Sequence, residues 1–140
     1  IWGRIEGDHI ESATSPVISA QCLRVACSDG HMAAASVKFK NKPSKEVMIE
    51  RWNNFKGRAQ ELNLPSAPEH YLTYCEEDNR PQTKLDRMTE NGMGVTIGRL
   101  REDTIFDYKF VSLSHNTLRG AAGGAVLMAE LLCAEGYMDR

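Results

Sequence analysis

The chain has 140 residues, of which 41% are hydrophobic and 26% are charged, and its formal net charge is −2. This composition is typical of a folded globular protein, and the length suits one hydrophobic core. Lysine and arginine are scattered, so no basic stripe favours nucleic acid or an anionic membrane surface as a partner. The longest apolar run, residues 121–134, is too short to cross a bilayer. Composition therefore predicts a single globular unit without nucleic acid or membrane partners.

The amino terminus begins Ile1-Trp2-Gly3-Arg4, without an initiator methionine or a signal-peptide pattern, and we expect the chain to be a piece of a larger protein. The cysteines are too sparse for a disulfide scaffold, which favours reduced thiols in the cytoplasm. Cys22, Cys27 and His31 lack a second cluster of ligands at zinc-binding spacing. We therefore expect no metal site.

The first predicted elements are two strands, at residues 17–27 and 32–39. Asp29-Gly30 lies between them, and this dipeptide favours a type I′ hairpin, in which both central residues have positive φ. After a polar break, Ser44 is placed to cap a helix over residues 44–62. Apolar residues recur there at helical spacing, at Met48, Trp52, Phe55, Ala59 and Leu62. This pattern predicts one amphipathic helix packed on a sheet.

The second half of the chain predicts three further strands, at residues 71–74, 94–100 and 105–113. Residues 76–92 between the first two are polar and predict a long ordered loop.

The last predicted element is a helix over residues 117–134, with Asn116 or Thr117 as its amino cap and Gly136 as its stop signal. It is apolar nearly all round and contains several glycines, so we expect it to have neighbours on several sides.

In the predicted hairpin, Ser28 pairs with His31 and Arg24 pairs with Ala35. Arg24 and His31 then project from the same face, with alanines around them. Arginine binds a carboxylate with a planar fork, and histidine exchanges protons near neutral pH, so the pair suits a small acidic substrate. The alternative is a surface arginine and a structural histidine. Cys27 points to the opposite face, so a nucleophile must come from elsewhere.

Several short segments resemble, in the same order, those of aspartate-semialdehyde dehydrogenases of the fungal and archaeal branch. They are Gln21-Cys22-Leu23-Arg24-Val25, Asp29-Gly30-His31, Arg80-Pro81-Gln82, Leu85-Asp86-Arg87, Gly92-Met93, Gly98-Arg99 and the run from His115 to Gly123. The resemblance covers the chain from Ile18 to about Leu132 and is most specific at its end.

The resemblance implies an α+β fold: a mixed β-sheet with helices packed on one face, plus a carboxy-terminal helix that packs on the nucleotide domain in the family. Residues 1–114 would form the substrate-binding and dimerisation domain, and residues 115–140 the helix belonging to the cofactor domain. The implied activity is NADP-dependent interconversion of L-aspartate 4-semialdehyde plus phosphate and L-aspartyl 4-phosphate, a step toward lysine, methionine and threonine. A homodimer or higher homo-oligomer is expected.

The resemblance also implies roles for particular residues. Arg24 would hold the substrate carboxylate, His31 would be the general acid/base, and Asn116 with Thr117 would contact the cofactor. The family's glycine-rich motif and its Ser-Asn-Cys nucleophile segment are absent, so we expect the chain alone to be inactive. Two other readings stay open: a non-catalytic interaction module that keeps this sheet as a dimerisation scaffold, and a related acyl-phosphate or semialdehyde reductase.

Overall fold

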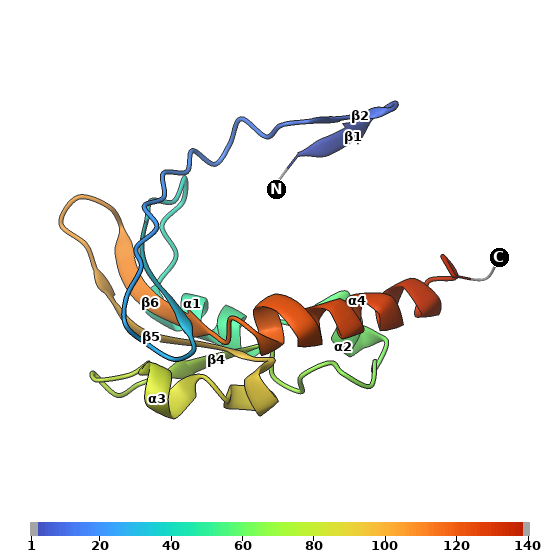
Figure 1. Cartoon of the computed structure of the whole chain (residues 1–140). Coiled ribbons are helices and arrows are strands. Elements are labelled where there is room, and N and C mark those ends of the chain that lie inside the picture. Colours follow the sequence, from blue (N-terminus) through green and yellow to red (C-terminus); the bar gives the residue numbers. More distant parts are fainter. Residues whose placement is uncertain (1–2, 139–140) are drawn as a thin grey trace.

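The structure is a computed structural model that describes residues 3–138, so Ile1 and Trp2 of the amino-terminal motif lie outside the described residues. A four-stranded sheet in the order β3-β6-β5-β4 forms its centre (Figure 1). Strand β6 is antiparallel to both of its neighbours, whereas β4 runs parallel to β5. This mixed sheet and its helices confirm the predicted α+β class.

The strands of the sheet are β3 (His31–Val37), β4 (Leu72–Cys75), β5 (Val95–Glu102) and β6 (Tyr108–Ser114). The helices are α1 (Lys45–Asn53), α2 (Arg58–Glu61), α3 (Thr83–Asp86) and α4 (Gly123–Ala134), with a 3-10 turn η1 (Thr89–Gly92) and a π-helical turn η2 (Leu118–Ala122). The predicted strands in the second half of the chain and the predicted strand at residues 32–39 are therefore confirmed, with small shifts of their ends.

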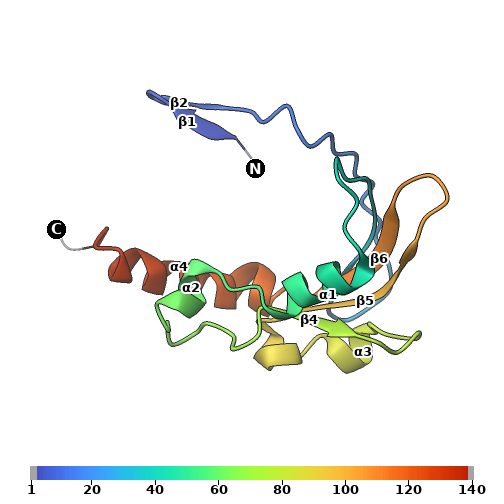
Figure 2. The same ribbon diagram turned by 180° about the vertical axis from the view of Figure 1, so that it is seen from behind.

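Helix α1 covers one face of the sheet (Figure 2). It begins as predicted after Ser44, whose hydroxyl accepts the Val47 N–H at 3.3 Å. The core on this face consists of Met48, Leu100 and Tyr108, with Val37, Ile49, Trp52, Tyr74 and Phe110 packed against them. Burying these large side chains is what holds α1 on the sheet.

The prediction of one continuous helix over residues 44–62 is wrong. Helix α1 ends at Asn53, and α2 begins after Gly57, whose backbone is extended with φ −99° and ψ 174°. Glycine has low helix propensity, so a break at this point costs little. Ala59 consequently leaves the first core and belongs to a second one with Met93 and Leu127.

The predicted loop at residues 76–92 is ordered and contains α3 and η1. Its centre is Asp86, which is only 3% exposed and accepts hydrogen bonds from the Arg80 guanidinium and from the Gln82 N–H. The Thr89 hydroxyl lies 3.0 Å from the hydroxyl of Thr96 on β5. Because Thr96 pairs with Leu113 and points away from the α1 core, this segment covers the opposite face of the sheet.

The terminal helix extends beyond the sheet (Figures 1 and 2). Gly136 has φ +76° and ends it as predicted, since the Gly136 and Tyr137 N–H groups donate to the carbonyls of Cys133 and Leu132. Only Leu127 of α4 is buried. In the part of the chain that the structure describes, no helix combines the length and hydropathy that a membrane span requires.

The predicted strand at residues 17–27 is wrong. Residues 12–30 contain no strand, and a short hairpin of β1 (Arg4–Glu6) and β2 (His9–Glu11) that the sequence did not predict lies far from the sheet (Figure 1). A strand is stable where it pairs with a neighbour and buries one face. Here the apolar side chains meet no core, and Val17 is 94% exposed.

Candidate functional site

His31 opens strand β3 at the edge of the sheet and pairs with Ser114, the last residue of β6. Alternation along β3 places its side chain on the same face as Ala33 and Ala35, as predicted. His31 is exposed. The sheet therefore presents an accessible imidazole beside small side chains, which leaves room for a ligand.

Gly30 fixes the turn immediately before His31. It is buried, has φ +107°, and donates its N–H to Oδ1 of Asn116 at 2.8 Å. A Cβ at this position would lie 3.0 Å from Leu113 Cδ1 and 3.1 Å from Thr83 Cγ2. Both the backbone conformation and the packing therefore favour glycine.

The prediction of a type I′ hairpin at this turn is wrong, because β3 pairs with β6 and residues 12–30 form no strand. Gly30 has positive φ but Asp29 does not, and His31 pairs with Ser114 rather than with Ser28. Strand β3 instead forms an antiparallel ladder of seven residue pairs with β6. A partner distant in the sequence has replaced the adjacent one.

His115 is a buried residue of the site that the sequence analysis did not identify. It is 7% exposed, and its Nδ1 accepts the N–H groups of Thr117 at 3.1 Å and Leu118 at 3.2 Å. These two donors assign the ring proton to Nε2. The capping role predicted for Asn116 or Thr117 therefore belongs to His115, because the Asn116 side chain is held by Gly30 instead.

Asn116 and Thr117 follow directly. Because Asn116 Oδ1 is occupied by the Gly30 N–H, its NH₂ group is the part of the amide that remains to donate to a ligand. Thr117 is exposed at the start of η2. Gly30 directly precedes His31, the predicted general acid/base. The hydrogen bond from Gly30 therefore places Asn116, the predicted cofactor-binding residue, beside the turn that leads to His31.

Within residues 3–138, no strand pairing holds Arg24 in this arrangement. Arg24 is exposed in the irregular segment 12–30, and within residues 3–138 its side chain makes no ion pair or hydrogen bond. Its predicted cross-strand partner, Ala35, pairs with Phe110 of β6. The predicted cross-strand pairing, which would place Arg24 on the face of His31, is therefore absent from the described strands.

The other polar cluster is the buried ion pair of Arg80 and Asp86. Hydrogen bonds from the Arg80 guanidinium hold the pKa of the Asp86 carboxyl below its usual value. Burial acts in the opposite direction on this pKa, but its effect is smaller. Burial raises the pKa of the Cys75 thiol, and the Asp86 charge adds to that rise. Cys75 is therefore kept in the thiol form, which does not suit a nucleophile. The motifs containing Arg80 and Asp86 were visible in the sequence, but their pairing was not.

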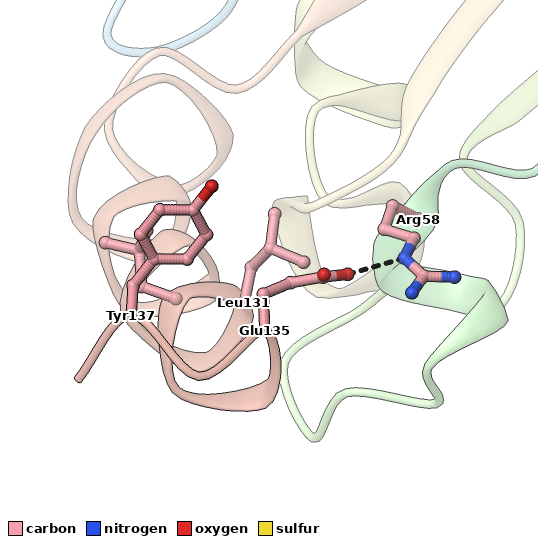
Figure 3. Close-up of a pocket in the computed structure, with 5 residues that line it drawn as sticks. Arg58, Leu131, Glu135 and Tyr137 are labelled. Atoms are coloured by element: carbon pink, nitrogen blue, oxygen red, sulfur yellow. Dashed lines mark hydrogen bonds and ion pairs between the residues drawn. The ribbon is translucent and has the colours of Figure 1, made fainter. Parts of the chain in front are cut away.

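A separate hollow of about 300 Å³ lies between α2 and the end of α4 (Figure 3). Arg58 Nε donates to Glu135 Oε1 at 2.6 Å across it, and Leu131, Leu132 and Tyr137 complete its wall. The end of α4 projects away from the sheet (Figure 1), and neither His31 nor Asn116 lines this hollow. Among residues 3–138, no three His, Cys, Asp or Glu side chains come together in a way that could hold a metal ion.

Comparisons with known proteins identify the family of the chain. A model of the family described as semialdehyde dehydrogenase, dimerisation domain, matches residues 1–119. The chain is 46% identical over 119 residues to aspartate-semialdehyde dehydrogenase of Saccharomyces cerevisiae, covering 84% of the chain and 33% of that enzyme. It is 42% identical over 135 residues to the Archaeoglobus fulgidus enzyme, covering 96% of the chain and 38% of that enzyme.

A further relative is the malonyl CoA reductase (NADP) of Metallosphaera sedula, 44% identical over 125 residues, covering 88% of the chain and 35% of that protein. Among solved structures, aspartate semialdehyde dehydrogenase with NADP from Candida albicans matches with a TM-score of 0.70 and 38% identity, covering 79% of this chain and 31% of that one. The chain thus spans about a third of its relatives. It belongs to the semialdehyde dehydrogenases, and residues 1–119 match the dimerisation domain of that family.

Proposed function

We propose that the chain is the carboxy-terminal part of an NADP-dependent oxidoreductase that interconverts L-aspartate 4-semialdehyde plus phosphate and L-aspartyl 4-phosphate. The observation that carries this proposal is the 2.8 Å hydrogen bond between Gly30 and Asn116, which sets the histidine turn beside the start of the terminal helix. The reaction would take place in the cytoplasm, on the route to lysine, methionine and threonine.

In this proposal His31 is the general acid/base, and Arg24 binds the carboxylate of the substrate. A cysteine from the preceding part of the protein would add to the aldehyde carbonyl while His31 takes the proton of the thiol. Loss of a hydride, for which NADP would be the acceptor, would convert this adduct to a thioester. Phosphate then displaces the thiolate to give the acyl phosphate. Cys22 and Cys27 are not this nucleophile, since both lie in the exposed irregular segment that contains Arg24.

Asn116 and Thr117 would hold the nicotinamide end of NADP, which supplies or accepts the hydride when bound. The NH₂ group left on Asn116 suits an amide carbonyl, and the exposed Thr117 hydroxyl provides a second polar group. The Thr117 and Leu118 N–H groups are already taken by His115, so they are not part of the cofactor site. This donor set fits a carboxamide and leaves the phosphates of NADP to the rest of the protein.

We propose that residues 1–114 form the substrate-binding and dimerisation domain and that the helix in residues 115–140 packs on the cofactor domain. The exposed apolar side chains of α4 support this division, since Val126 is 53% and Met128 is 55% exposed. Apolar residues at this density on a projecting helix are typical of a surface that another domain covers.

We also propose that the protein is a homodimer or higher homo-oligomer. Strand β3 is an edge strand, and apolar side chains remain exposed on it and on the segment before it: Val17, Ile18, Leu23, Val25 and Met32. A second copy could bury them. Light scattering on the chain should give a mass of about twice 15.6 kDa or more. A monomer at high micromolar concentration contradicts this proposal.

Two alternatives have support of their own. The Metallosphaera sedula relative favours a related reductase. The cysteines of this chain, which do not supply the nucleophile in the proposal above, favour a non-catalytic interaction module. Two assays with the intact parent protein test all three: phosphate-dependent reduction of NADP by aspartate semialdehyde, and oxidation of NADPH by malonyl CoA. We expect activity with aspartate semialdehyde, weaker activity with malonyl CoA, and none from the 140-residue chain alone. A parent active only on malonyl CoA supports the reductase, and an inactive parent supports the interaction module.

A further inference from the structure

We infer that His115 is a positioning residue that fixes the cofactor helix against the catalytic turn through its Nδ1 atom. This inference rests on the proposed function. The backbone at residues 114–118 joins three parts of the site: Ser114 pairs with His31, Asn116 accepts the Gly30 N–H, and Leu118 opens η2. His115 is the one buried side chain in this stretch.

The His115 ring closes the first turn of the helix. Its Nδ1 accepts the N–H groups of both Thr117 and Leu118, and its carbonyl accepts the Gly120 N–H at 3.0 Å. A helix start leaves several N–H groups without a partner inside the helix, and Nδ1 of His115 is the acceptor for two of them. His115 therefore determines the direction in which the chain leaves β6 and enters η2.

The orientation of the ring is fixed by packing. A Cβ on Gly92 would lie 3.4 Å from Cδ2 of His115 and only 2.5 Å from Cδ1 of Leu118, so the backbone of Gly92 lies close to both side chains. Gly92 has φ +80°, which favours glycine at this point. The ring is held between η1 and the start of η2, and its Nδ1 edge faces the two N–H groups.

This geometry makes the δ position decisive. Asparagine carries its oxygen at the same covalent distance from the backbone as Nδ1 of histidine, so His115→Asn keeps an acceptor for the two N–H groups. Glutamine carries its amide one bond further out, at the position of Nε2. His115→Gln is therefore the matched variant, which keeps a polar side chain of similar size but removes the acceptor from the δ position.

The test uses the intact parent protein and compares both variants with the wild type for kcat and for the KM of NADP. We expect His115→Gln to lower kcat/KM by about tenfold or more, because a small misplacement of Asn116 is costly, and His115→Asn to stay within about threefold of the wild type. Hydrogen exchange at the Thr117 and Leu118 amides should be faster in His115→Gln and little changed in His115→Asn.

An active wild type whose two variants behave alike, whether both active or both inactive, overturns the inference. An inactive wild type counts against the proposed function instead. In that case, or if His115→Gln does not fold, ¹⁵N NMR of the wild-type chain decides the question. An unprotonated Nδ1 with a protonated Nε2 supports the capping role, and a proton on Nδ1 overturns it.

Discussion

Replacing His31 with alanine in the intact parent protein is expected to lower kcat/KM for aspartate semialdehyde by about 100-fold or more, the usual loss for a general acid/base. His31 is exposed at the edge of the sheet, and its side chain makes no hydrogen bond with residues 3–138. Removing it therefore leaves no buried group unpaired, so stability should change little. Steady-state kinetics and circular dichroism of the same preparations measure the two effects.

His9→Ala is the matched control, because His9 is also an exposed histidine at the start of a strand but lies in the hairpin far from the sheet (Figure 1). It should retain wild-type kinetics. A His31→Ala protein with wild-type kinetics would falsify the assignment of His31 as the acid/base.

Replacing Asp86 with alanine is expected to lower the free energy of unfolding of the chain by about 3 kcal/mol. Asp86 is 3% exposed and receives hydrogen bonds from Arg80 and from the Gln82 backbone, and the change leaves both donors without their acceptor. The estimate is at the low end for breaking a buried pair because the Arg80 side chain keeps 27% exposure and can be hydrated. Urea denaturation gives the value.

Asp78→Ala is the control for this change, since Asp78 lies in the same segment but is exposed. Its effect should lie within about 0.5 kcal/mol of zero. The double variant Arg80→Ala with Asp86→Ala should be no less stable than Asp86→Ala alone, because no guanidinium is then left unpaired. If Asp78→Ala and Asp86→Ala destabilise the chain equally, the buried pair does not stabilise this segment.

The same pair makes a pH prediction. Hydrogen bonds from Arg80 lower the pKa of Asp86 in the folded state. A carboxyl with a lowered folded pKa contributes stability that is complete above its unfolded value of about 3.9 and is lost as pH falls through the folded value. The stability difference between wild type and Asp86→Ala should therefore shrink when denaturation is repeated at acid pH. A difference that grows below about pH 4 contradicts this linkage.

The sequence predicted the elements whose signals are local. Ser44 caps α1, Gly136 ends α4, and the strands β3 to β6 occur close to their predicted positions, because capping, glycine conformation and alternation depend on neighbouring residues. The resemblance in short motifs also identified the family. His31 and Asn116 were singled out before any contact between their segments was known.

Only the tertiary structure decided which segments pair. Asp29-Gly30 predicted a local hairpin, yet β3 pairs with β6, which is about 80 residues away, because that ladder connects β3 to the buried sheet. The role of His115 and the ion pair of Arg80 with Asp86 likewise depend on burial and on partners brought together by folding. Local patterns determine where elements begin and end, whereas long-range packing determines their partners, and the candidate site is assembled from those partners.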